Sequence, residues 1–274
     1  MKIGLALGGG GARGIAHLGL WQRLRELGVP VHCVAGTSIG AIAGAIIAAG
    51  RVEEALAWCK MSSWWKLPGL LFDRPSTKAL FAGRRVEKKL REIIAAERFA
   101  DLAMRFAAVA TDLNTGEAVV MQEGDLLSAV RASMSIPCVF RPVEREGRVL
   151  IDGQFVNPVP VSVCRALGAD VVIAVDVNPL EDPAAAKPFK KLHIMGVLVK
   201  SIGIFNYELT RRELAVNKPD VLIRPDVGQV LALDFRRAGR LVEIGRQAVD
   251  EGVVEALKAK GALTILATHE KKGS

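Results

Sequence analysis

Three short motifs contain the residue types that an acyl transfer needs. Ser38 lies between Gly36 and Gly40 in the run Gly-Thr-Ser-Ile-Gly. A serine in this setting, between an apolar strand and an apolar helix, is typical of a nucleophile elbow, in which a sharp and strained turn exposes the hydroxyl. The structural alternative is a serine that only caps the following helix. The motif predicts a nucleophilic serine at the edge of a sheet.

A glycine-rich run precedes this motif and supplies backbone donors. It reads Gly8-Gly9-Gly10-Gly11-Ala12-Arg13-Gly14 and follows an apolar strand. Backbone N–H groups without side chains in front of them can converge on an anion, so we expect an oxyanion hole from the Gly9 to Gly11 loop and the N–H of Ile39. A plain strand-to-helix turn is the alternative. A dinucleotide or Walker loop is disfavoured, because no acidic residue ends the second strand and Ile15 replaces the lysine.

Asp152 is the candidate base. The strand 148–151 delivers Asp152-Gly153 into a loop, and a partly desolvated carboxylate in contact with Ser38 can take its proton. An Asp-Gly pair by itself is usually only a turn. Of the four histidines, none is expected at the end of a strand where a base belongs, and His193 is the least excluded. The residues therefore favour a serine and aspartate pair over a triad.

Composition limits the classes of protein. The chain has 274 residues, half of them hydrophobic, and a net charge of +8. Its basic residues are scattered and lack interleaved aromatics, which argues against nucleic acid and leaves an anionic membrane surface open. The four cysteines form no C-x-x-C pair, so we expect no metal and no cofactor. The apolar run at the N-terminus is too short for a secretory signal, which favours a cytoplasmic location, including the inner membrane face.

The elements expected to position these motifs alternate along the chain. Apolar runs and helical spacing predict a single three-layer α/β domain over 1–274 with a mainly parallel central sheet between helices. A buried strand at 171–177 is expected at the centre of the sheet, and Leu241 to Ala256 are expected in one long last helix. The tail 269–274 is expected to be disordered. The other expected strands are 3–7, 31–34 and 221–223. The expected hairpins are 106–111 with 117–122 and 143–145 with 148–151. One helix is expected to end at Gly28, and further helices are expected over 39–49, 52–61 and 192–217.

Together these motifs resemble the patatin-like phospholipase family, over residues 5–165. The runs 110–113 and 131–137 also look familial. The resemblance implies a patatin-like fold, Ser38 as nucleophile, Asp152 as base, and an oxyanion loop with its basic residue at Arg13 and its last glycine at Gly14. It also implies a lipid acyl-ester hydrolase that works without a cofactor. The chain departs from the family at Gln154, where glycine or alanine is usual, and this amide either bonds to Asp152 or points away.

A tryptophan-rich segment bears on the substrate. Trp64 and Trp65 lie in an apolar, loop-like stretch, 63–72, which either contacts lipid or packs against the core or a partner subunit. The leading hypothesis is a phospholipase A, lysophospholipase or esterase. Its rivals are a non-catalytic lipid-binding or regulatory protein on the same scaffold and a nucleotide-binding protein. The lipid, the position of the ester, the acyl length and the oligomeric state stay open.

Overall fold

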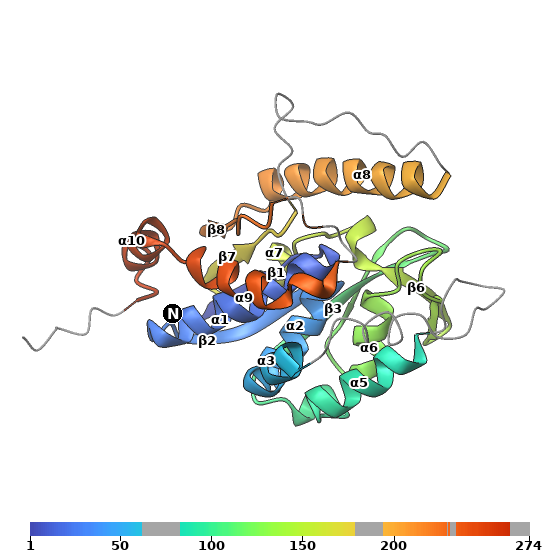
Figure 1. The fold of residues 1–274 in the computed structure, drawn as a ribbon, viewed down its shortest axis with the longest axis horizontal. Helices are drawn as coiled ribbons and strands as arrows, with labels where there is room; N and C mark the ends of the chain where they lie inside the picture. The colour runs from blue at the N-terminus through green and yellow to red at the C-terminus, as the bar shows by residue number, and fades with distance from the viewer. Residues whose placement is uncertain (62–82, 179–193, 229, 231–233, 264–274) are drawn as a thin grey trace, which may run out of the picture.

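A computed structural model describes residues 1–61, 83–178, 194–228, 230 and 234–263. Its centre is a mixed sheet of eight strands in the order β5-β6-β3-β2-β1-β7-β8, with β4 paired to β3 outside this path (Figure 1). The pairings of β2 with β1 and β3, and of β7 with β1 and β8, are parallel, and the rest are antiparallel. The strands are β1 (Ile3–Leu7), β2 (Val31–Thr37), β3 (Arg105–Asp112), β4 (Ala118–Met121), β5 (Val143–Arg145), β6 (Arg148–Asp152), β7 (Val171–Val175) and β8 (Val221–Ile223).

Helices cover both faces of the sheet, which makes the three-layer α/β architecture that the sequence predicts. Alternate residues of the strands enter two separate apolar clusters, as the two-residue period of a strand requires. The smaller cluster joins the sheet to α7 and α8, and the larger joins it to the helices that include α1, α2 and α9. The described helices are α1 (Ala16–Glu26), α2 (Ile39–Ala48), α3 (Val52–Met61), α5 (Arg84–Ile94), α6 (Leu126–Ser133), α7 (Val161–Ala166), α8 (Ile194–Val216), α9 (Ala238–Gln247) and α10 (Glu251–Ala259), with short 3-10 turns η1 (Gly11–Ile15), η2 (Phe99–Asp101), η3 (Gly153–Phe155) and η4 (Phe235–Arg237).

The register of the parallel strands places two of the motifs side by side. Leu7 at the end of β1 is paired with Gly36 near the end of β2. The glycine loop and the Ser38 turn therefore leave the sheet at the same edge. Asp152 ends β6 opposite Ala110 of β3, a strand that also pairs with β2. The sheet thus brings the three motifs together although they are far apart along the chain.

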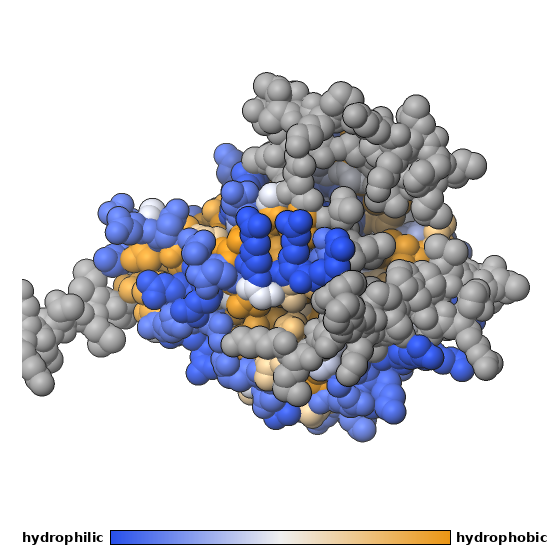
Figure 2. Space-filling view, viewed as in Figure 1, coloured by the Kyte–Doolittle hydropathy of each residue, from blue (hydrophilic) through white to orange (hydrophobic). Residues whose placement is uncertain are grey.

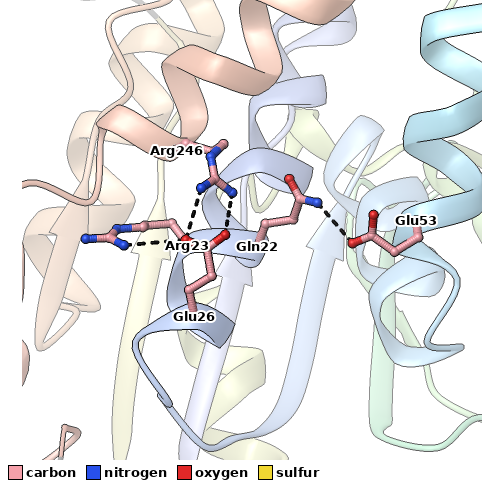
Figure 3. Close-up of polar contacts among 5 residues, drawn as sticks. All are labelled: Gln22, Arg23, Glu26, Glu53 and Arg246. Carbon is pink, nitrogen blue, oxygen red and sulfur yellow. Dashed lines mark hydrogen bonds and ion pairs between the residues drawn. The ribbon is translucent and has the colours of Figure 1, made fainter.

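Helices α1 and α9 lie against each other, and both contact η1 at the end of the glycine loop. Their backbones approach so closely that a Cβ at Gly245 would lie 1.9 Å from the carbonyl oxygen of Ala16. At the surface, Arg246 of α9 donates to both carboxylate oxygens of Glu26, at 2.8 and 3.0 Å (Figure 3). The close backbone contact is buried and the ion pair is exposed, so the packing holds α9 in place more than the charge pair does.

Two of the sequence-based expectations about the fold are wrong. Strand β7 is fully buried, but it lies second from the edge of the sheet, between β1 and β8. Burial on both faces requires helices above and below a strand and does not require a central place. The expected single last helix is two helices, because the Asp250 carboxylate accepts the N–H of Val253 at 2.9 Å and starts α10 as a new helix.

The other elements follow the expected ranges within a few residues, including both hairpins. The segment with Trp64 and Trp65 and the tail 269–274 lie outside the described residues. Hydrophilic side chains cover much of the described surface, with apolar side chains showing between them (Figure 2). Within the described ranges, no helix combines the length and the apolar character that crossing a membrane requires.

Candidate active site

Ser38 lies at the tight turn between β2 and α2. Its φ of 58° and ψ of −123° are strained for a residue with a side chain. The flanking glycines make this turn possible, since a Cβ at Gly36 would lie 2.2 Å from the oxygen of Gly40 and one at Gly40 would lie 2.1 Å from the oxygen of Leu7. Although Ser38 occupies the N-cap position of α2, its hydroxyl makes no cap hydrogen bond. The capping alternative therefore does not describe this serine.

The hydroxyl of Ser38 is bonded to Asp152 instead. Ser38 Oγ donates to Asp152 Oδ2 at 2.5 Å, and both side chains are almost completely buried. The other carboxylate oxygen, Oδ1, accepts the backbone N–H of Gln154 at 2.9 Å. One oxygen is thus fixed by the backbone while the other faces the serine. This is the arrangement that a general base needs, because a direct hydrogen bond defines the path of the proton.

Burial also changes the pKa of Asp152. Desolvation raises the pKa of Asp152 from 3.8 to about 7, against the opposing hydrogen bonds from Ser38 and Gln154. A carboxylate with a pKa near neutrality is ionised often enough to accept a proton, and it is a stronger base than an exposed aspartate.

Two further hydroxyl groups, those of Ser133 and Thr111, hold the pair, and no role for them was predicted from the sequence. The N–H of Ser38 donates to Ser133 Oγ at 2.9 Å, and that hydroxyl donates to the oxygen of Val109 at 2.5 Å. Thr111 Oγ1 donates to the carbonyl oxygen of Asp152 at 2.8 Å. Both Ser133 and Thr111 fall in runs that resemble the family, which was the only signal available. Their bonds tie the elbow and the aspartate to β3.

The glycine loop contributes fewer donors than the sequence predicts. The N–H of Gly9 donates to the oxygen of Pro158 at 3.1 Å, so it is committed to the scaffold. Within the described chain, the N–H groups of Gly10, Gly11 and Ile39 have no acceptor. Of the predicted oxyanion donors, the N–H groups of Gly10, Gly11 and Ile39 are therefore available, and that of Gly9 is not. Arg13 Nε donates to the oxygen of Gly10 at 3.0 Å, within the same loop.

Of the two alternatives for the Gln154 amide, the bond to Asp152 is not formed, and the side chain points toward Gly9. The backbone N–H of Gln154, and not its amide, bonds to Asp152. The side chain lies against Gly9, where an added Cβ would come within 2.3 Å of Gln154 Cδ. The Gln154 side chain is larger than the glycine or alanine usual in the family, and it fits here because Gly9 has no side chain. The departure therefore changes the packing of the glycine loop and leaves the contacts of Asp152 intact.

An apolar cavity of about 150 Å³ lies beside the serine. Ser38 and Gly11 belong to its lining, so the serine and the loop face the same space. Near this space Lys89 Nζ lies 5.8 Å from the centre of the Trp58 ring. Such a cavity suits a hydrocarbon chain, because its walls offer almost no polar atom to a ligand. Other lining residues include Ile39, Ile42, Leu90, Met134, Ile136 and Phe140.

Among the described residues, the other candidates are unreactive or lie away from Ser38. Cys59 lines the apolar cavity, but burial raises the pKa of its thiol to about 11, which makes it a poor nucleophile. His17 is buried in α1 beneath the glycine loop, and His32 bonds to the start of β1, so neither reaches Ser38. His193 and the tryptophans at 64 and 65 lie outside the described residues. The described residues contain no group of three or more side chains that could hold a metal ion.

Comparison with known proteins agrees with this geometry. The sequence model of the family described as "Patatin-like phospholipase" matches residues 5–165. An uncharacterized NTE family protein of Mycobacterium tuberculosis is 39% identical over 180 residues, which are 66% of this chain and 50% of that protein. Patatin-like phospholipase domain-containing protein 6 of Homo sapiens is 35% identical over 187 residues, which are 66% of this chain and 14% of that protein. The chain thus spans half or less of these relatives.

A solved structure extends the likeness to the fold. VipD from Legionella pneumophila superimposes with a TM-score of 0.61 at 14% identity, over 94% of this chain and 66% of that one. At this identity the match concerns the fold alone. The family match, in contrast, covers more than half of the chain and includes the glycine loop, the Ser38 turn and Asp152. The chain therefore belongs to the patatin-like phospholipase family.

Proposed function

We propose that the protein hydrolyses acyl esters of lipids through a covalent acyl-enzyme, with Ser38 as nucleophile and Asp152 as base. The observation that carries the proposal is the 2.5 Å hydrogen bond from Ser38 Oγ to Asp152 Oδ2, at a strained turn beside an apolar cavity. Membership of a family named for phospholipases supports a lipid ester as substrate.

The reaction follows from the positions of these groups. Ionised Asp152 takes the proton of Ser38 as Oγ bonds to the acyl carbon, and the carbonyl electron pair moves to oxygen. The N–H groups of Gly10, Gly11 and Ile39 stabilise this oxyanion. When the intermediate collapses, the leaving alkoxide takes the proton from Asp152. Water then attacks the acyl-enzyme, gives its proton to Asp152, and releases the fatty acid while Ser38 regains a proton.

The proposed substrate places its acyl chain in the apolar cavity. The cavity wall and the serine share one space, so a bound chain brings its carbonyl to the nucleophile. The positive net charge of +8 favours approach to an anionic lipid surface, and we propose peripheral contact with the cytoplasmic face of a membrane.

Labelling with a fluorophosphonate tests the nucleophile. Wild type, Ser38→Ala and Ser162→Ala are incubated with the probe and their intact masses are recorded. Ser162 of α7 is the matched control, because its hydroxyl accepts from the Asn157 amide and makes no hydrogen bond with Asp152 among the described residues. We expect an adduct on wild type and on Ser162→Ala, and none on Ser38→Ala.

The same proteins are then incubated with a series of monoacyl and diacyl phospholipids, and the release of fatty acid is measured. Adduct on Ser38→Ala would contradict the assignment of the nucleophile. An intact fold with no adduct on any of the proteins would favour the non-catalytic lipid-binding alternative, because a packed glycine loop beside Gln154 would then be closed to an acyl group.

A further inference from the structure

Three successive carbonyl groups of the glycine loop are each held by a side-chain donor. The oxygen of Gly8 accepts from His17 Nε2 at 2.8 Å. The oxygen of Gly9 accepts from Asn178 Nδ2 at 3.2 Å. The oxygen of Gly10 accepts from Arg13 Nε, a contact within the loop. His17 and Asn178 come from outside the loop, from α1 and from the chain that follows β7.

Because the peptide bond is planar, a hydrogen bond to a carbonyl oxygen also fixes the direction of the N–H group of the next residue. In a trans peptide the C=O of one residue and the N–H of the next point in opposite directions. When His17 holds the oxygen of Gly8, the N–H of Gly9 must point the other way, and it does so toward Pro158. When Asn178 holds the oxygen of Gly9, the orientation of the Gly10 N–H is fixed in the same manner.

The orientation of these peptide groups has to be fixed by hydrogen bonds, because glycine has a wide range of allowed backbone conformations. Four consecutive glycines can rotate their peptide planes at little steric cost. A rotated peptide would place a carbonyl oxygen where the substrate oxyanion forms, and it would repel that charge. Gly10 itself has a φ of 164° and a ψ of 14°, and Gly11 has a positive φ of 61°. The conformation is thus set by contacts with the surroundings.

The state of His17 fits this role. Its side chain is fully buried, and burial lowers its pKa from 6.5 to about 4, so the ring is neutral near pH 7. The oxygen of Gly8 can only accept, so Nε2 carries the ring proton. The other nitrogen, Nδ1, has no partner among the described residues. An apolar residue would avoid this unpaired polar atom.

We infer that His17 and Asn178 are positioning residues that hold the peptides of Gly8 and Gly9 so that the N–H of Gly10 faces the oxyanion. The inference rests on the proposed function. Neither side chain contacts the reacting atoms. Their effect on catalysis passes through the backbone of the loop, and it concerns the transition state, since the ester carbonyl gains its full charge only there.

The test compares His17→Gln, His17→Leu, Asn178→Ala and the double variant His17→Leu/Asn178→Ala with wild type. Glutamine can place an amide N–H near the position of Nε2, and leucine cannot donate. The matched control is His32→Leu. Nδ1 of His32 accepts the N–H of Ile3 at 3.1 Å, at the start of β1, whereas the glycine loop follows the end of β1. For each protein, kcat and KM for a lipid ester, the rate of fluorophosphonate labelling and the melting temperature are measured.

We expect His17→Leu and Asn178→Ala to lower kcat and the labelling rate at least about tenfold, with KM within about twofold, since a misplaced oxyanion donor costs turnover more than binding. His17→Gln regains most of the loss, and His32→Leu keeps the wild-type kcat. Because both side chains hold one loop, the double variant loses less than the product of the two single losses. Unchanged kcat in His17→Leu or Asn178→Ala, or additive losses in the double variant, would overturn the inference.

Where a variant fails to fold, a measurement on the wild-type protein tests the hydrogen bond from His17 to Gly8. Nitrogen-15 NMR of the histidine rings reports which nitrogen carries the proton. We expect His17 with a protonated, slowly exchanging Nε2 and a bare Nδ1. A proton on Nδ1 would refute the contact with Gly8. If wild type shows neither labelling nor turnover, the proposed function fails, whereas the NMR result still confirms or refutes this control of the loop.

Discussion

Replacing Asp152 with asparagine separates the role of this residue in stability from its role in catalysis. Asparagine has nearly the same shape and cannot ionise. The carboxyl group of Asp152 is buried, which raises its pKa from 3.8 to about 7. Between these two values the folded protein keeps a proton that the unfolded chain has released. The contribution of Asp152 to stability therefore falls as the pH rises through this window, and this contribution is present in wild type and absent in Asp152→Asn.

The size of the effect follows from the shift. Each unit of pKa corresponds to about 1.4 kcal/mol at 25 °C. From pH 5 to pH 8 the folded form loses the proton and the unfolded form is already ionised, so Asp152 costs wild type about 2.5 kcal/mol. Asp152→Asn avoids this cost. Its free energy of unfolding, relative to wild type, should rise by about 2.5 kcal/mol between pH 5 and pH 8.

The difference between the two proteins is needed because His17 acts in the opposite direction. Its folded pKa is lowered to about 4 from 6.5, so the unfolded chain binds an extra proton between these values and stability rises with pH there. In wild type the contributions of His17 and Asp152 largely cancel between pH 4 and pH 6.5. Subtracting the wild-type curve from that of Asp152→Asn removes the His17 contribution, which both proteins share.

The assay is urea unfolding followed by circular dichroism at half-unit steps of pH from 5 to 8. Ser38→Ala serves as a second variant. The hydrogen bond from Ser38 lowers the pKa of Asp152, so its loss should move the transition to a higher pH. Parallel stability curves for wild type and Asp152→Asn over this range would refute a raised pKa, and with it the argument that burial makes Asp152 a base.

Four further predictions concern activity and packing. The value of kcat/KM for wild type should rise about tenfold from pH 6 to pH 8, following ionisation of Asp152, and a flat profile would argue against a base with a pKa of about 7. Gly40→Ala should lower both the melting temperature and the labelling rate, because its Cβ would lie 2.1 Å from the oxygen of Leu7, and a wild-type labelling rate would contradict this. Ile42→Phe narrows the apolar cavity and should lower turnover of long-chain esters more than that of acetyl esters, whereas equal losses would place the acyl chain elsewhere. Gly245→Ala should destabilise the fold by about 1–3 kcal/mol through its clash with Ala16, while Glu26→Gln leaves the melting temperature nearly unchanged, and the reverse order would show that the exposed ion pair holds α9.

The sequence predicted the local elements of the site well, because their signals are local. The apolar run of β1, the glycines around Ser38 and the Asp-Gly pair at the end of β6 each act on neighbouring backbone, and the structure has each in its expected element. The expected last helix was wrong for a related reason. Its apolar spacing continues through the break, and the cap of Asp250 on Val253, which divides it, is a weak signal beside that spacing.

What the sequence determined by itself is the set of reactive residue types, their order and the turns that present them. Only the tertiary structure decided which of them meet. Ser38 and Asp152 are 114 positions apart, and their contact depends on the register of β2, β3 and β6. The commitment of the Gly9 N–H to Pro158, and the hold of His17 on Gly8, depend in the same way on how helices and loops pack on the sheet. A hydrogen bond between distant segments requires both partners to be placed by the whole fold, and local backbone preferences contain no record of that placement.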